Sequence, residues 1–235
     1  QDTAWMKYVE ACTIESKATT EPADIKIEVA RGGEYKIRLE DGTTVWLNSE
    51  SSLIYPEKFT GDKRAVRLSG EGYFEVARDE KKPFIVSVTD MEIKVLGTKF
   101  NVTAYQDEKM TTTTLISGAV EVVTPHRSVQ LQPGKQAMVQ EGGDDITVLE
   151  VDVELATSWT AGIFKFDKMA LTDICTRLSR WYDIDFVFEG ETGKEKFTGG
   201  TWKYVPLKDF LSKIERVTNV LFLFENNTVK VVPKK

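Results

Sequence analysis

The sequence predicts an all-β domain, either a sandwich or a solenoid-like stack of about ten short strands, followed by a small α+β domain. Two observations lead to this fold class. From residue 25 to 154, short runs of alternating apolar and polar residues are separated by turn residues about every 8–12 positions, as in β-sandwiches. From residue 162 to 235, two amphipathic helical patterns each lie between β-type apolar runs.

Residues 1–24 are polar, and we expect a lead-in with one short helix around residues 5–11. The strand pattern begins near Ile25. A first hairpin is predicted at Asp41-Gly42, since Asp-Gly supplies the positive φ that a tight hairpin turn requires. Apolar residues alternate on both sides of this turn, at Tyr35, Ile37 and Leu39 before it and at Val45 and Leu47 after it.

Similar runs continue as far as residue 139, and none of them has the 3.6-residue period of a helix. Gly70 and Gly72 interrupt the series, and we expect a bulge or turn there. They do not indicate a nucleotide-binding loop, because a third glycine is missing and a strand pattern follows where a helix would be needed. The predicted strand segments are 66–68, 74–76, 84–88, 93–95, 100–102, 111–115, 119–123, 128–131 and 136–139.

The C-terminal region is predicted to contain one strand–helix–strand unit twice. An alignment that places Leu171 on Leu207, 36 residues further on, keeps its register through the helix and into the following strand. Both helices carry apolar residues at i, i+3, i+4 and i+7, so each has one face to bury. These residues are Leu171, Ile174, Cys175 and Leu178 in the first copy and Leu207, Phe210, Leu211 and Ile214 in the second.

The predicted domains are therefore a polar lead-in over 1–24, an all-β domain over 25–154, a linker over 155–161 and a duplicated βαβ domain over 162–235. One βαβ copy is too small to bury its helix face alone, so the two copies are expected to pack together.

The composition narrows the range of partners. The net charge of −6 comes from 31 basic and 37 acidic residues with interspersed signs, so no basic stripe indicates nucleic acid as a partner. The longest apolar run, Val220–Phe224, is far shorter than the roughly 20 residues that span a bilayer, and we expect no membrane insertion. Because the chain begins at Gln1 without a leader, we expect a processed chain or a fragment.

Reactive chemistry is not indicated. The one histidine, His126, lies in a predicted turn, and a single histidine supports neither a histidine metal cluster nor a Ser-His-Asp triad. Cys12 and Cys175 form no Cys-x-x-Cys motif, and a lone, widely spaced pair does not indicate a disulfide framework. We therefore expect no catalytic residue, no cofactor and no metal.

Two other classes of function stay open at this point. The five tryptophans could form a carbohydrate-stacking platform, although Trp46, Trp181 and Trp202 each fit a core or sheet-face position. A pair of carboxylates on a β scaffold could hydrolyse a glycoside, although most acidic residues here lie at turns. A secreted glycan-binding module is the main alternative, and a hydrolase is the second.

Six motifs occur in a fixed order along the chain: Asp41–Asn48, Gly70–Val76, Pro83-Phe84, Val95–Val102, Gly118–Val122 and Leu131–Gly134. Together they resemble the periplasmic β domain of FecR-like anti-sigma factors, particularly those of Bacteroidetes. The C-terminal repeat is similar to the short N-terminal domain of secretins and TonB-dependent transporters, so the resemblance covers about residues 25–235.

The resemblance implies the periplasmic part of a single-pass inner-membrane protein. A cytoplasmic segment, absent from this chain, would bind an extracytoplasmic-function sigma factor, and a transmembrane helix would follow it. In the periplasm, the C-terminal domain would meet the signalling domain of an outer-membrane TonB-dependent transporter. The family has no catalytic residue, so the motif residues are expected to form turns and core.

For the transporter contact, the sequence favours strand addition at an exposed sheet edge. The first candidate is the last strand, with Thr228, Val229, Lys230, Val231 and Val232. The second is the strand Phe197–Tyr204, which contains Trp202 and Tyr204. The alternative is that the last strand is an ordinary edge, protected from further pairing by Lys230 and Pro233.

Overall fold

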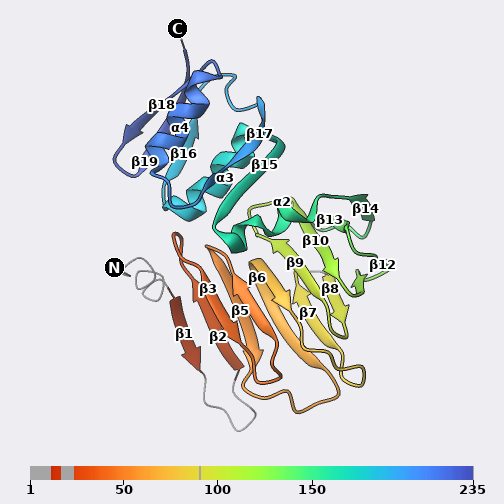
Figure 1. The fold of residues 1–235 in the computed structure, drawn as a ribbon. Coiled ribbons are helices and arrows are strands. Elements are labelled where there is room, and N and C mark those ends of the chain that lie inside the picture. The colour runs from red at the N-terminus through yellow and green to blue at the C-terminus, as the bar shows by residue number, and fades with distance from the viewer. Residues whose placement is uncertain (1–11, 17–23, 90, 235) are drawn as a thin grey trace. The chain divides into compact units, whose positions relative to one another are not determined.

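The computed structural model describes residues 12–16, 24–89 and 91–234. The chain divides into two compact units, Gln1–Thr157 and Ser158–Lys235, which Figure 1 shows as ribbons. The fold is mostly β, with many strands and a small helical part, as predicted. The short helix expected around residues 5–11 lies outside the described residues.

The N-terminal unit consists of two sheets that share one long strand, β6 (Arg64–Glu75). Nearly all neighbouring strands are antiparallel, and β6 and β7 are parallel. The first sheet has the order β1 (Cys12–Ser16), β2 (Asp24–Val29), β5 (Ser51–Pro56), β6, β7 (Phe84–Val88), β8 (Met91–Val95), β11 (Val120–Val123) and β12 (Ser128–Leu131). The second has the order β3 (Tyr35–Arg38), β4 (Thr44–Leu47), β6, β9 (Lys99–Ala104), β10 (Met110–Ser117), β13 (Lys135–Gln140) and β14 (Ile146–Glu150).

Strand β6 passes from one sheet to the other at Gly70. Residues 64–69 pair with β5 and β7, whereas residues 70–75 pair with β4 and β9. Gly70 has a φ of +91°, and a Cβ there would lie 2.4 Å from the Ser51 Oγ and 2.7 Å from the Ser51 Cα. Only glycine fits this conformation and this close approach. The expected break at Gly70 and Gly72 is thus a change of sheet inside one continuous strand.

A single apolar core lies between the two sheets. Along β4, β5, β6 and β8, buried residues alternate with more exposed ones, which is the pattern of strands with one face on a core. Phe74 and Phe100 of the second sheet stack with ring centroids 5.0 Å apart, and Phe84 of the first sheet lies 6.3 Å from Phe74. The aromatic contact joins the two layers, as in a sandwich.

The lead-in expected over residues 1–24 contains strand β1, which pairs with β2 from Cys12↔Val29 to Ser16↔Ile25. Strands β5 and β14 were also not predicted. The polar composition of β1 hides this edge strand from a search for apolar alternation, because an edge strand needs little buried surface. Strand β14 has apolar residues at Ile146, Val148 and Leu149, but they do not alternate strictly and most of the strand is exposed.

Asp41 of the first hairpin does more than form a turn. Its Oδ2 accepts a hydrogen bond of 2.7 Å from the Arg64 Nη1 and another of 2.7 Å from the Thr43 hydroxyl. The Arg64 side chain is almost fully buried and also donates to the backbone oxygens of Ala77 and Lys82. The Asp-Gly-Thr motif therefore supplies the counter-ion for the buried Arg64 guanidinium. Without this carboxylate, a buried charge would lower the stability of the folded state.

The segment 155–161, expected as a linker, is helical. Helix α2 (Val153–Thr157) ends the N-terminal unit and η1 (Ser158–Ala161) begins the C-terminal one. The rest of the C-terminal unit comprises β15 (Ile163–Ala170), α3 (Leu171–Tyr182), β16 (Asp185–Phe188), β17 (Lys196–Trp202), α4 (Leu207–Arg216), β18 (Val220–Glu225) and β19 (Thr228–Pro233).

Both copies of the C-terminal repeat run strand–helix–strand. Helix α3 begins at Leu171 and α4 at Leu207, the two residues that the sequence alignment pairs. The apolar residues predicted for each helix face are buried. The first strands of the copies pair as β15–β17, whereas the second strands lie on either side of β19 in the order β16-β19-β18. Each copy thus contributes one strand to each sheet.

In the parts of the chain that the structure describes, no helix has both the length and the apolar composition to cross a bilayer. Cys175 is buried on α3 and forms no disulfide. Burial raises the pKa of its thiol, so Cys175 behaves as a small apolar residue.

Candidate functional site

The last strand is not a sheet edge, so that part of the docking prediction is wrong. Strand β19 is central: it pairs in parallel with β16 and antiparallel with β18. The turn at Asn226, with a φ of +51°, folds β19 back onto β18, and β16 of the first copy takes the other side. Both rows of backbone groups on β19 are therefore occupied, and no partner strand can be added to it.

The side chains of β19 point alternately to two different environments. Val229 and Val231 are completely buried. Thr228, Lys230 and Val232 lie on the opposite face and are partly exposed. Of the predicted docking residues on this strand, only these three are positioned to meet a partner, and they would do so through a face of the sheet.

That face carries aliphatic side chains from all three strands, and we call it the outer face: Val187, Leu221, Leu223, Lys230 and Val232. The Val187 and Leu223 residues are each 47% exposed, and both lie opposite Lys230 in the strand register. Leu221 lies opposite Val232 in the next row. The uninterrupted apolar run Val220–Phe224 was the signal for this surface, because a strand that is apolar on both faces needs cover on both.

Lys230 lies at the centre of the outer face and forms an ion pair with Glu225, with an Nζ–Oε2 distance of 2.8 Å. The hydrogen bond that Lys230 donates to the Glu225 carboxylate raises the pKa of Lys230, and the negative charge of Glu189 adds to this effect. Lys230 therefore stays protonated, and the residue lies between Val187 and Leu223 in the strand register.

The second predicted docking element, around strand β17, does have an open edge among the described residues, since β17 pairs only with β15. The Lys203 N–H donates to the Gly162 carbonyl across this pair at 2.9 Å. Because amides alternate in direction along a strand, the N–H groups of Gly200 and Trp202 point away from β15. Trp202 and Tyr204 are 60% and 61% exposed, and both are available to a partner.

Lys203, between these two aromatic residues, lies in an aromatic box that the sequence did not predict. Its Nζ lies 4.2, 5.5 and 5.6 Å from the ring centroids of Trp181, Phe164 and Trp159. The residue is 1% exposed, and burial lowers the pKa of Lys203 to about 7, while the ring faces attract the ammonium and oppose this shift.

The box also fixes the backbone of the segment that presents Trp202 and Tyr204. The Trp181 Nε1 donates to the Lys203 carbonyl oxygen at 2.7 Å, and the Tyr182 hydroxyl donates to the same oxygen at 3.0 Å. Trp159 and Trp181 are thus enclosed around Lys203 and are not positioned to stack on a carbohydrate. In the sequence, the only indication of this aromatic box is the position of Lys203 between Trp202 and Tyr204.

In the N-terminal unit, polar residues of three sequence motifs meet at Glu71. The Asn48 side-chain amide donates to the Glu71 Oε2 at 2.8 Å, and the Asn101 amide donates to the Oε1 at 3.0 Å. The Thr103 hydroxyl also donates to Oε1, at 3.3 Å. One carboxylate held by neutral donors links β4, β6 and β9, and it does not provide the pair of carboxylates that glycoside hydrolysis requires.

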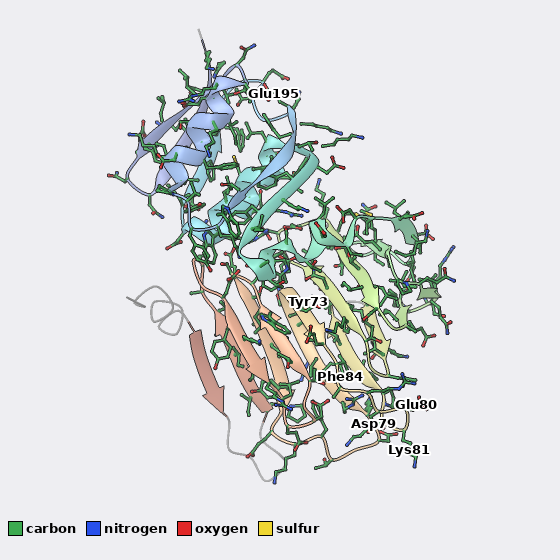
Figure 2. All side chains as sticks on the ribbon, in the orientation of Figure 1. Tyr73, Asp79, Glu80, Lys81, Phe84 and Glu195 are labelled. Carbon is green, nitrogen blue, oxygen red and sulfur yellow. The ribbon has the colours of Figure 1, made fainter. Side chains whose placement is uncertain are left out.

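A cleft of about 620 Å³ lies in the same unit, beside the loop between β6 and β7. Figure 2 shows Asp79, Glu80 and Lys81 on this loop, shortly before Phe84 at the start of β7. Gly97 lines the cleft, and a Cβ there would lie 2.6 Å from the Arg78 Cα. Gly97 is therefore needed for close packing of this loop rather than only for a turn.

Within the described ranges, no group of three or more His, Cys, Asp or Glu side chains is arranged to hold a metal ion.

Comparison with known proteins identifies the family of both units of the chain. A family model described as "FecR protein" matches residues 25–121, and a second, "FecR, C-terminal", matches residues 163–231. A search of curated proteins gave no match.

Two crystal structures of a candidate anti-sigma factor from Parabacteroides distasonis ATCC 8503 are similar to most of this chain. The structure at 1.65 Å resolution has a TM-score of 0.83 and 30% sequence identity, and the match covers 89% of this chain and 99% of the other. The structure at 2.50 Å gives the same TM-score and identity, with coverage of 90% and 100%. The chain belongs to the FecR-like anti-sigma factors, whose role is regulatory rather than enzymatic.

Proposed function

We propose that this chain is the periplasmic sensory region of a single-pass inner-membrane anti-sigma factor. It receives a signal from the signalling domain of an outer-membrane TonB-dependent transporter and relays it to an extracytoplasmic-function sigma factor, which a cytoplasmic segment outside this chain would bind. The single observation that carries the proposal is the family membership of both units.

The C-terminal unit has the features that a protein-docking domain needs. Among the described strands β17 pairs with β15 alone, so its other edge offers backbone groups to a partner, and two exposed aromatic side chains lie at its end. Aromatic residues dominate the binding energy of many protein interfaces. The backbone of this segment is held by Trp181 and Tyr182, so the edge is presented in one conformation before a partner binds.

The proposal is tested by calorimetric titration of the chain with the isolated signalling domains of the TonB-dependent transporters of the same cell. One such domain is expected to bind with saturable 1:1 stoichiometry. If none of these domains binds, the proposal that this chain receives its signal from a TonB-dependent transporter is wrong.

The role of the β17 edge is tested by the variant Trp202→Lys, which places a charge at the exposed edge, and by Trp202→Ala. Each is expected to weaken binding by at least about tenfold, the size of effect expected for a residue central to an interface. Thr147→Lys is the control for the added charge, because Thr147 is an exposed residue on β14, an edge strand of the other unit. Equal affinities for all four proteins would exclude the edge as the docking element.

A further inference from the structure

The three-stranded sheet of the C-terminal unit has apolar side chains on both faces. Helices α3 and α4 bury their apolar residues in this unit, and the sheet side chains buried with them include Val220, Phe222, Val229 and Val231. The opposite, outer face leaves Val187, Leu221 and Leu223 exposed. Contiguous exposed apolar residues on a small domain mark an interaction surface, because their exposure to water is unfavourable.

The outer face is continuous across the sheet. Val187, Lys230 and Leu223 form one cross-strand row, and Val232 and Leu221 form the next. Strands lie about 4.8 Å apart, so the aliphatic side chains on either side of Lys230 are roughly 10 Å apart. Lys230 occupies the position between them in the row, and the methylene groups of a lysine side chain add apolar surface to the strip.

Charge decides which partner fits this strip. Among the described residues that form the outer face, Lys230 is the one cation, while Glu189 and Glu225 supply two carboxylates beside it. The Glu189 N–H donates to the Val231 carbonyl, which fixes Glu189 at the end of the strip. The two carboxylates exceed the single ammonium, so the surface is complementary to apolar residues flanked by lysine or arginine.

The same charges disfavour two other occupants. A second copy of the chain would bring its own Glu189 and Glu225 against this face, and like charges in an interface are repulsive. An anionic lipid surface would be repelled for the same reason.

We propose that the outer face is a second docking surface for the signalling domain of the transporter, beside the β17 edge, and that the domain binds it through aliphatic side chains flanked by basic ones. This inference rests on the proposed function and names the surface involved. It differs from strand addition at β17, because contact is made through side chains on a sheet face rather than through backbone groups at an edge.

The test is a calorimetric titration of the transporter domain into the double variant Val187→Thr, Leu223→Thr. Threonine keeps the strand propensity at both exposed positions but removes aliphatic surface. The control is Val217→Thr, because Val217 is 74% exposed in the same unit and lies at the end of α4, away from the outer face. The double variant is expected to bind at least about tenfold more weakly, and the control as wild type.

A second pair of changes tests the charge argument. The variant Glu189→Gln, Glu225→Gln is expected to bind more slowly at low salt and to lose most of the salt dependence of the association rate, since that dependence reports charge complementarity. An unchanged salt dependence would show that the partner is not basic and would overturn this part of the inference.

The outcomes separate the two proposals. If the wild type binds and the Val187/Leu223 variant binds equally well, the outer face is not a docking surface, but the transporter relay stands. If the wild type binds no transporter domain, both proposals fail. Self-association of the wild type that the same variant abolishes, measured by sedimentation, would assign the face to a second copy instead.

Discussion

The Lys203 ammonium nitrogen lies 4.2 Å from the centroid of the Trp181 indole, the nearest of the three rings around it. Aromatic boxes of this kind attract cations, yet burial disfavours the charged form of the lysine. The free energy of keeping Lys203 charged in the folded state therefore depends on pH. Lys203 belongs to the segment that also carries Trp202 and Tyr204.

The first prediction concerns this pH dependence. Burial lowers the pKa of Lys203 from 10.5 to about 7 in the folded state. Between these values the unfolded state binds more protons, so the stability of the C-terminal unit rises as the pH rises from about 7 towards 10.5. Lys203→Met is expected to remove this part of the pH dependence. Urea unfolding of both proteins at pH 7 and pH 9.5, followed by tryptophan fluorescence, measures it, and parallel profiles would contradict it.

The second prediction concerns the point where β6 changes sheets. Gly70→Ala is expected to destabilise the N-terminal unit, because the new Cβ meets Ser51 and the φ is positive. Gly134→Ala is the matched control, since Gly134 has a φ of +84° but no atom within 4 Å of the new Cβ. The control should lose about 1–2 kcal/mol from backbone strain alone. Gly70→Ala should lose at least about 2 kcal/mol more in urea unfolding, because a well-packed site cannot relax around an added atom.

The third prediction concerns the buried ion pair. Asp41→Asn leaves the Arg64 guanidinium without its counter-ion. The free energy of unfolding is expected to fall by about 3 kcal/mol, the lower end of the range for a broken buried ion pair, because the Asp41 side chain is 12% exposed. Glu80→Gln removes the same charge from the exposed Arg78–Glu80 pair and should change stability little. Chemical denaturation of the three proteins checks this. Equal stabilities for the two variants would mean that the pair contributes nothing.

The fourth prediction concerns Cys175. Its thiol is buried and its pKa is raised, so thiolate formation is disfavoured in the folded state. In a Cys12→Ser background, labelling with a thiol reagent at pH 8 is expected to be slow in the native protein and fast in urea. Rapid native labelling would show that α3 opens readily from the strands it packs against.

Local patterns predicted much of the fold. The Asp41-Gly42 turn forms as expected, with Gly42 at a φ of +87° and β3 paired to β4 around it. The helix faces at Leu171 and Leu207 were also predicted, because a 3.6-residue period is visible within one segment. The family resemblance was confirmed by both family models and by the similar crystal structures.

Features that depend on distant segments were not predictable. Strand β19 reads as an edge from its own residues, and only its pairing with β16, about forty residues earlier, makes it central. The change of sheet in β6 depends on Ser51, and the burial of Lys203 depends on three aromatic residues from other elements. No periodicity along the chain reports such contacts, because they bring together segments that are remote in sequence.

The strand that belongs to two sheets has a mechanical consequence for the N-terminal unit. Because β6 pairs with strands of both sheets, one sheet cannot slide past the other without breaking hydrogen bonds of β6. The two sheets therefore resist shear together. A protease that cut between Arg64 and Glu75 would not free an intact half, since each half would lose its central strand. The N-terminal unit is therefore expected to unfold as one cooperative body rather than sheet by sheet.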